Sequence, residues 1–197
     1  MDSLIQTIKS LDKKELEKVN SFVDTLDFTP NTVFQGDNPA DVDESVRTST
    51  GCNLENSHEI TGLLHDKMND ALDEYKERVL KVNDIFGYYP IAGGSGTKSH
   101  REDIQVLHYG KGNLYKFHHD ASDNIKDREF YRTLSVIMYL KTADEGGGTL
   151  FPHQSFYPKA GETLVFPSNW CYPHTGEKVT KGEKRVAVTW YYVELAD

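Results

Sequence analysis

The pattern of apolar residues changes near residue 100, and this change constrains the fold more than any other feature of the sequence. Beyond it, short apolar runs with period two are separated by clusters of Gly, Pro and Asp. These runs are DIQVLHYG, YKFHHD, TLSVIMYLK, GETLVF and RVAVTWYYV. Before it, apolar residues recur with helical spacing. Helices first and strands afterwards predict an α+β protein with an antiparallel sandwich or barrel, and argue against a parallel βαβ fold.

Two helices are expected before that point. Asp12 and Glu15 form an acidic helix start, and a helical apolar face follows, which predicts a helix over about residues 12–26. Its face consists of Val19, Phe22, Val23 and Leu26. The second helix begins after Ser57 and continues to at least Tyr75. Its apolar face consists of Ile60, Leu63, Leu64, Met68, Ala71, Leu72 and Tyr75.

Segments 30–56 and 87–101 show neither the helical nor the strand period of apolar residues and are expected to be loops. One of them contains AGGSGTKS (92–99), which superficially resembles a phosphate-binding loop. In the Walker motif Lys follows Gly directly, whereas Thr97 separates the two here, and no helical pattern follows. We therefore interpret it as a flexible loop, and the glycines of DEGGGTLF as a turn.

Length and charge limit the architecture and the partners. A chain of 197 residues fits a single domain, with a helical N-terminal part over about 1–85 and a β core over about 100–195. Its net charge of −9, without a dense basic block, argues against nucleic acid or an anionic membrane as a partner. No signal peptide or membrane span is recognisable, so a soluble, cytoplasmic protein is expected. Cys52 and Cys171 lack metal or disulfide spacing and are expected to be reduced.

The stretch LYKFHHD contains the strongest candidate for a metal site. Along a strand, side chains alternate between faces, so His118 and Asp120 share one face while His119 points to the other. A further histidine is needed, and His174, just beyond the predicted strand GETLVF, is the best candidate. On its own, His-x-Asp also fits a polar surface strand.

Two histidines and one carboxylate on one face leave three positions open on Fe(II), as in non-haem iron oxygenases. If 2-oxoglutarate chelates such an ion, its far 5-carboxylate needs a cation in the pocket. Lys184 stands ten residues after His174, at the start of a predicted strand. Arg185 is adjacent, and alternation lets only one of the two face the site.

Four blocks in order resemble the prolyl 4-hydroxylase branch of the Fe(II)/2-oxoglutarate dioxygenases: LHYGKGNLYKFHHD, RTLSVIMYLKTADEGGGTLFP, PKAGETLVF and KGEKRVAVTW. Upstream, SVRTSTGCNL is similar to a block that precedes the catalytic core in plant and algal members. The resemblance covers roughly residues 45–193. It implies a double-stranded β-helix (jelly roll) with supporting N-terminal helices. It also implies His118, Asp120 and His174 as iron ligands, and Lys184 as the partner of the 5-carboxylate.

The resemblance also implies roles for residues around the iron. Tyr109 and Tyr139 match positions that line the cosubstrate pocket, although both could equally be aromatic strand core. The positions near the substrate proline are Tyr115, Arg132 and Trp190. Arg132 could equally be a charge at a strand end, and Arg47 matches a loop that covers the peptide groove.

The chain departs from the family pattern on the substrate side. Tyr192 stands where algal-type members have histidine, Arg185 where tryptophan is usual, and Asn113 where glutamine is usual. The segment PSNWCYPH before His174 is short. These differences affect the expected substrate more than the expected reaction.

The expected function is hydroxylation of a C–H bond, most of all in a peptidyl proline, with Fe(II) as cofactor, 2-oxoglutarate as cosubstrate and ascorbate as reductant. Succinate and CO2 are the coproducts. Alternative substrates are free proline, a lysyl side chain or a small metabolite. A different class of function is a jelly-roll binding module with a vestigial metal site, but the three ligands and Lys184 occur together, which a decayed site has little reason to retain.

Overall fold

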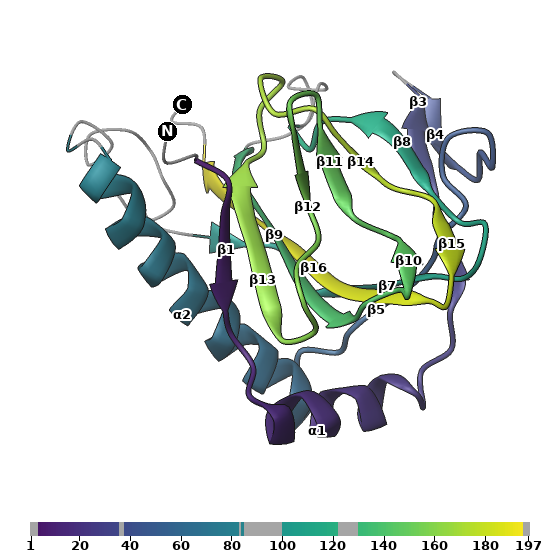
Figure 1. The fold of residues 1–197 in the computed structure, drawn as a ribbon, viewed down its shortest axis with the longest axis horizontal. Coiled ribbons are helices and arrows are strands. Elements are labelled where there is room, and N and C mark those ends of the chain that lie inside the picture. Colours follow the sequence, from purple (N-terminus) through teal and green to yellow (C-terminus); the bar gives the residue numbers. More distant parts are fainter. Residues whose placement is uncertain (1–3, 36–37, 83, 85–99, 122–129, 195–197) are drawn as a thin grey trace.

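The computed structural model describes residues 4–35, 38–82, 84, 100–121 and 130–194. Two antiparallel sheets form the body of the protein, and two helices lie along one side of the larger sheet (Figure 1). This arrangement is the jelly roll with supporting helices that the sequence predicts. The phosphate-loop-like segment 92–99 lies outside the described residues.

The larger sheet has eight strands. Seven of them follow the order β1 (Gln6–Lys9), β13 (Glu162–Pro167), β9 (Phe130–Lys141), β16 (Lys184–Glu194), β7 (Gln105–Tyr109), β5 (Thr50–Asn53) and β2 (Thr29–Pro30). The eighth, β6 (His100–Arg101), pairs with β16 beyond the end of β7. The long strands β9 and β16 pair along almost their whole length and form the centre of the sheet.

The smaller sheet has four strands in the order β12 (Gln154–Phe156), β11 (Thr149–Phe151), β14 (His174–Gly176) and β8 (Tyr115–His118). Two short ribbons complete the described strands: β10 (Glu145–Gly146) with β15 (Val179–Lys181), and β3 (Val33–Gln35) with β4 (Asn38–Asp41). The smaller sheet contributes Phe151 and Phe156 to an apolar layer between the two sheets.

Strand β9 is buried on both faces, and its alternation separates two layers of core. Leu134, Val136, Met138 and Leu140 pack toward the helices. Ile137 and Tyr139 point the other way, into the layer between the sheets. Over residues 134–140, a side chain at an odd-numbered position therefore faces the smaller sheet.

Helix α1 (Lys13–Val23) begins at a capping box in which Glu15 N–H donates to Asp12 Oδ1 and Asp12 N–H donates to Glu15 Oε2. It ends three residues earlier than predicted, because the amides of Thr25 and Leu26 donate to carbonyls three residues back, Phe22 O and Val23 O, and do not continue the i→i−4 pattern. The apolar Leu26, which suggested a longer helix, packs on the core from beyond the helix end.

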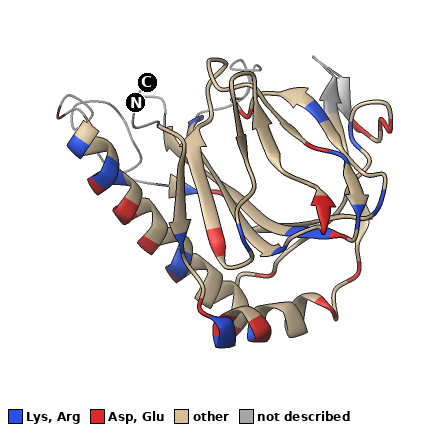
Figure 2. Cartoon of the chain, in the orientation of Figure 1, with Lys and Arg blue, Asp and Glu red and all other residues tan. Residues whose placement is uncertain are grey.

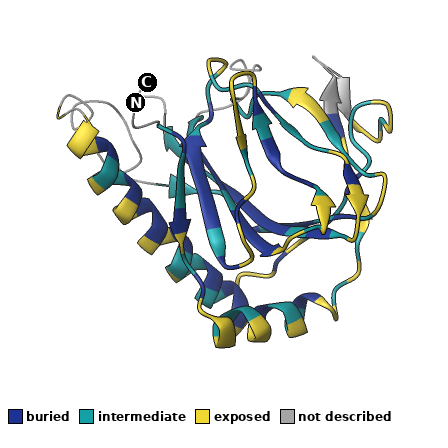
Figure 3. Cartoon of the chain, in the orientation of Figure 1, coloured by how far each residue is buried: buried dark blue, intermediate teal, exposed yellow. Residues whose placement is uncertain are grey.

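Helix α2 (Glu59–Val82) confirms the second predicted helix and extends it by two turns. Its buried face includes Leu64, Met68, Leu72 and Tyr75, and the opposite face is exposed (Figure 3). Charged residues of both signs follow the exposed faces of α1 and α2 (Figure 2). Neither described helix is long and apolar enough to cross a membrane.

The prediction of helices first and strands afterwards is wrong for the N-terminal part. Strand β1 precedes α1 and pairs with β13, and β5 lies within the predicted loop 30–56 and pairs with β7. Both strands have four residues, too few for a period to be recognised, and both are stabilised by strands far away in the sequence. The predicted loop 87–101 also ends in a strand, because residues 100–101 form β6. Cys52 and Cys171 are both free thiols, as expected.

Candidate metal centre and the pocket beside it

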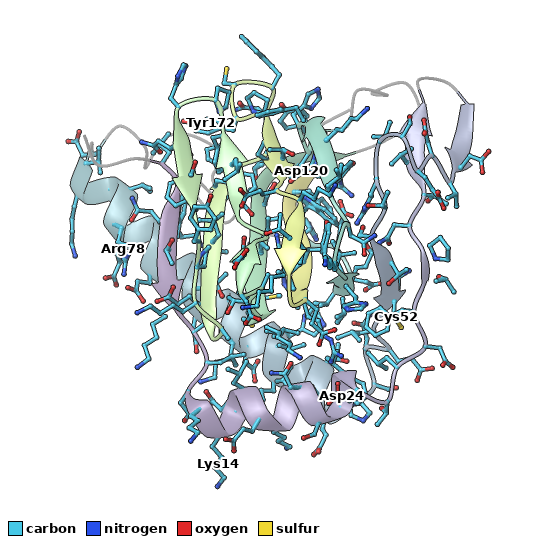
Figure 4. All side chains as sticks on the ribbon, turned by 45° about the vertical axis from the view of Figure 1, so that its right-hand side comes forward. Lys14, Asp24, Cys52, Arg78, Asp120 and Tyr172 are labelled. Carbon is cyan, nitrogen blue, oxygen red and sulfur yellow. The ribbon has the colours of Figure 1, made fainter. Side chains whose placement is uncertain are left out.

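The fold brings together the three side chains that the sequence proposes as ligands. Strands β8 and β14 are antiparallel neighbours, and His118 is directly opposite His174 in their register. Asp120 follows β8 by two residues and lies far from α1, where Lys14 and Asp24 are labelled (Figure 4). One potential ligand atom from each of the three residues lies within 4.8 Å of the others. His119 does not belong to this group of the described residues, as strand alternation predicts.

The two imidazoles face the carboxylate through the same ring nitrogen. His118 Nε2 lies 3.5 Å from Asp120 Oδ1, and His174 Nε2 lies 3.6 Å from Asp120 Oδ2. Their Nδ1 atoms contact backbone carbonyls, at 2.8 Å for His118 and Lys116 O and at 3.2 Å for His174 and Tyr172 O. A carbonyl oxygen can only accept, so Nδ1 carries the proton and a neutral ring has its lone pair on Nε2.

The electrostatics of the group fit a bound cation. His174 is 4% exposed, and burial lowers its pKa to about 4, so its ring is neutral at neutral pH. Burial alone raises the pKa of the Asp120 carboxyl, but His174, His118 and a hydrogen bond from Ser135 together hold it below its usual range. Imidazole lone pairs and a carboxylate therefore meet at one place. Two His and one carboxylate form the donor set of non-haem Fe(II) sites.

Asp120 is held in place by two serines that the sequence analysis did not identify and by Arg132, which it did. The Ser135 hydroxyl donates to Asp120 Oδ2 at 2.6 Å and contacts Ser168 Oγ at 2.8 Å. Arg132 Nη1 donates to the backbone carbonyl of Asp120 at 3.3 Å. A signal for Ser135 was available in the sequence, because it is a single polar residue inside the apolar run TLSVIMYLK.

Lys184 lies in the apolar layer between the sheets and is 3% exposed. Its Nζ lies 5.0 Å from the ring centroid of Tyr109, its register partner on β7, and 5.1 Å from that of Tyr139. Burial lowers the pKa of Lys184 to about 7, against 10.5 for an ordinary lysine. Tyr139 is fully buried, and its hydroxyl is hydrogen-bonded to Thr149 Oγ1 at 2.7 Å, a partner that the sequence did not indicate.

The neighbouring Arg185 points out of this layer. Its guanidinium is paired with Asp24 at the end of α1 and also lies 3.5 Å from Glu183. Of the two adjacent cations, the structure thus places Lys184 inside and Arg185 outside. Gly147 (φ +75°) lies in the predicted glycine turn, beside the lysine stem. A Cβ at Gly147 would lie 3.6 Å from Lys184 Cδ and 3.1 Å from Ala143 Cβ.

Of the residues expected near the substrate, Tyr115 and Arg132 contact this group, and Trp190 contacts Arg132. Tyr115 stacks on the His118 ring with centroids 3.6 Å apart, and the Arg47 guanidinium lies 4.7 Å from the Tyr115 centroid. The Arg132 guanidinium lies 4.0 Å from the Trp190 ring centroid. Tyr115 and Arg132 thus each contact a metal-side residue.

Arg132 has an ionic partner that the sequence analysis missed. Glu102 accepts from its Nε at 2.5 Å and from its Nη2 at 2.6 Å, a bidentate arrangement. This partner lies 30 residues earlier in the chain, and no local pattern connects the two. Asn113, where the family usually has glutamine, is also engaged, because it bonds to Gly110 N–H and to Thr48 O.

Comparisons with known proteins agree with this geometry. Residues 104–192 match a family described as the 2OG-Fe(II) oxygenase superfamily. A putative prolyl 4-hydroxylase of Acanthamoeba polyphaga mimivirus is 39% identical over 107 residues, covering 46% of this chain and 44% of that protein. The probable prolyl 4-hydroxylase 8 of Arabidopsis thaliana is 29% identical over 182 residues, covering 77% of this chain and 56% of that protein. The chain thus spans about half the length of these relatives.

Two solved structures show the same fold. The viral collagen prolyl hydroxylase of Paramecium Bursaria Chlorella virus-1, in complex with 2OG, has a TM-score of 0.68 at 22% identity and covers 97% of both chains. A prolyl hydroxylase of Trichoplax adhaerens, in complex with a peptide fragment of hypoxia inducible factor, also has a TM-score of 0.68, at 15% identity. That match covers 97% of this chain and 84% of the other.

Proposed function

We propose that this chain, whose residues 104–192 match the 2OG-Fe(II) oxygenase superfamily, is a member of that family and hydroxylates peptidyl proline. The reaction consumes 2-oxoglutarate and O2 and releases succinate and CO2. The observation that carries the proposal is the convergence of His118, Asp120 and His174 in the same inter-sheet region as the buried cation of Lys184. A jelly-roll module that only binds has no need to bury such a lysine beside three convergent donors.

His118, Asp120 and His174 would hold Fe(II). When bound, iron supplies the oxidising power that an unactivated C–H bond requires. The protein's own part is to orient the donors through the carbonyls of Lys116 and Tyr172 and the hydroxyl of Ser135. Ascorbate is the reductant that we propose for keeping the iron in its ferrous form.

Lys184 would bind the 5-carboxylate of 2-oxoglutarate. A buried ammonium is costly without a counter-ion, and its lowered pKa reflects that cost. A carboxylate at the Nζ atom removes the cost by forming a charge-assisted hydrogen bond. The rings of Tyr109 and Tyr139 lie beside the Lys184 ammonium, and both would exclude water from the ion pair with the 5-carboxylate.

Peptidyl proline is favoured as substrate by the names of the relatives and by the residues near the proposed metal site. Tyr115 stacks on His118, and Arg132 contacts both Asp120 O and the ring of Trp190, so two aromatic rings lie near the metal-side residues. Aromatic faces suit the apolar pyrrolidine ring of proline. Arg47, stacked on Tyr115, would flank the peptide on one side.

Mass spectrometry tests the substrate. Proline-rich peptides are incubated with enzyme, Fe(II), 2-oxoglutarate and ascorbate, and we expect a gain of one oxygen on a proline residue. The Asp120→Ala variant serves as the inactive control. Oxygen gain on free proline, on a lysyl side chain or on a small metabolite, with no peptide modified, would overturn the peptidyl-proline substrate.

A further inference from the structure

Two buried serine hydroxyls lie in series behind the Asp120 carboxylate. Ser135 on β9 and Ser168, which directly follows β13, are each 1% exposed. Ser135 Oγ lies 2.6 Å from Asp120 Oδ2, and the two hydroxyl oxygens lie 2.8 Å apart. The pair thus connects β9 and the end of β13, which are neighbouring strands of the larger sheet, to a residue that follows the edge strand of the smaller one.

The direction of both hydrogen bonds follows from the number of protons. An ionised carboxylate can only accept hydrogen bonds, so the Ser135 hydroxyl must donate its single proton to Asp120. Ser168 must then donate to Ser135, because the Ser135 oxygen has only lone pairs left. The two hydroxyls therefore point in one direction, toward the carboxylate, and polarise each other. Ser135 bonds one of the two carboxylate oxygens, Oδ2, and thereby fixes the rotation of the group.

Packing does not explain a serine at position 135. This odd-numbered position of β9 faces the inter-sheet layer, where its neighbours on the same face are Ile137 and Tyr139. A buried hydroxyl costs free energy unless it is hydrogen-bonded, and an alanine here would have no such requirement. In the described structure the Ser135 hydroxyl is hydrogen-bonded to Asp120 and Ser168, so its benefit lies in what it does to the carboxylate.

Ser168 also fixes the backbone next to Asp120. The amide of Ala121, the residue after Asp120, donates to Ser168 O at 2.8 Å. Ser168 N–H in turn donates to Thr133 O on β9 at 3.0 Å. Ser168 thus contacts the peptide after Asp120 directly, and it reaches the Asp120 side chain through the Ser135 hydroxyl.

We propose that Ser135 and Ser168 are positioning residues that set the orientation of the Asp120 carboxylate for metal binding. This inference rests on the proposed function and extends it to two residues that do not contact the ion. Removing the partner that orients a metal ligand typically weakens metal affinity by about 10- to 100-fold. We expect a loss of about this size for Ser135→Ala and a smaller loss for Ser168→Ala, which leaves the Ser135 bond to Asp120 in place.

The test is an anaerobic titration of the metal-free full chain with Co(II), a spectroscopic substitute for Fe(II), without 2-oxoglutarate or peptide. The matched control is Thr163→Val on the adjacent strand β13. Its hydroxyl is fully buried and has no hydrogen-bond partner in the described structure, so the substitution removes a buried hydroxyl without touching Asp120. Ser135→Thr retains the hydroxyl and should retain most of the affinity. Thermal unfolding of each metal-free variant separates a loss of fold from a loss of orientation.

The expected result is weaker Co(II) binding by Ser135→Ala at an unfolding temperature close to that of Thr163→Val. Equal affinity of Ser135→Ala and the wild type overturns the positioning role. If Ser135→Ala does not fold, Ser168→Ala tests the positioning role instead. Unchanged Co(II) affinity and an unchanged Co(II) spectrum in Ser168→Ala would then contradict the inference. If the wild type itself binds no Co(II) or Fe(II), the proposed function fails first, and that outcome is distinct from a failure of the serine variants alone.

Discussion

Within the site, backbone carbonyls orient two imidazoles and a hydroxyl orients one carboxylate. The donor atoms of His118, His174 and Asp120 consequently face one another through contacts made by the protein itself. Such preorganisation lowers the cost of assembling the site when a ligand binds. Lys184 is different, because burial in an apolar layer disfavours its charge and the negative charge of Glu177 offsets only part of that cost.

Lys184→Ala should raise the apparent KM for 2-oxoglutarate by about ten- to a hundredfold, because a buried charge-assisted hydrogen bond contributes roughly 1.5–3 kcal/mol. Metal affinity should change little. Arg185→Ala is the matched control, since this neighbouring cation is paired with Asp24 outside the inter-sheet layer. Steady-state kinetics with varied 2-oxoglutarate measure the KM of both variants. A large KM effect for Arg185→Ala and none for Lys184→Ala would contradict the assignment.

The affinity for 2-oxoglutarate should also fall as pH rises above about 7. The pKa of the free Lys184 ammonium is about 7, and a bound carboxylate raises it again. Below pH 7 the lysine is already charged and the affinity is complete. Above it, binding must take up a proton, which weakens affinity by up to about tenfold per pH unit.

Titration of the Co(II)-loaded protein with 2-oxoglutarate at several pH values measures this slope. In Lys184→Ala the affinity should be lower and nearly independent of pH over the same range. If the variant keeps the slope of the wild type, another group is responsible for it.

Strand alternation was sufficient to predict the face that His118 and Asp120 share and to set His119 apart. It could not predict Ser135, Ser168, Thr149 or Glu102. Each of these residues acts through a partner on a different strand or loop, at a separation that no local period encodes. Arg132 contacts the ring of Trp190, the other strand residue that the resemblance puts near the substrate, but its bidentate bond to Glu102 depends on how β9 and the residue after β6 are arranged in space.

Among the elements, α1 supports the outer side of the larger sheet and depends on its N-terminal cap. Val19 and Val23 are completely buried against that side, while the start of the helix is exposed. Asp12→Ala removes one half of the capping box, so we expect the free energy of unfolding to fall by about 0.5–2 kcal/mol. Urea denaturation measures this change.

Lys14→Ala is the matched control, since Lys14 is an exposed residue of the same first turn. Metal affinity should be the same in both variants, because α1 lies far from Asp120 (Figure 4). A loss of metal affinity in Asp12→Ala would show that the helix cap influences the site, contrary to this expectation.

Long elements were predictable and short ones were not. α2 and β9 have enough residues for their periods to be recognised, and both appear where the sequence places them. β1 and β5 are short, and their pairing with β13 and β7 supplies the stability that their own sequences do not signal. Tertiary packing also explains why α1 was predicted too long. Leu26 is apolar because it packs on the core from beyond the helix end, not because it belongs to the helix.

In the whole molecule, the helices and the site occupy different sides of the larger sheet. One core layer joins the helices to the sheet, and the other layer contains Lys184 and the tyrosines that surround it. Tyr192 lies on β16 directly opposite Arg132 in register and stacks on His100, with ring centroids 5.3 Å apart. Because Arg132 is one of the residues proposed to lie near the substrate, we propose that Tyr192 forms part of the substrate rim.

Tyr192→His should change the ranking among proline peptides while leaving peptide-independent 2-oxoglutarate decarboxylation nearly intact. Tyrosine is bulkier than histidine and cannot become cationic, so the exchange alters the rim and not the metal side. Competition among peptides, read by mass spectrometry, measures the ranking. An unchanged ranking would show that Tyr192 does not contact the substrate.

The central claim is that His118, Asp120 and His174 hold Fe(II) in a form that chelates 2-oxoglutarate. The most direct measurement is the visible absorption spectrum after anaerobic addition of Fe(II) and 2-oxoglutarate to the metal-free protein. We expect the weak charge-transfer band of the chelated cosubstrate in the wild type and in His119→Ala, and its loss in each of His118→Ala, Asp120→Ala and His174→Ala. A wild-type protein that stays colourless, or a band that disappears equally in His119→Ala, would contradict the claim.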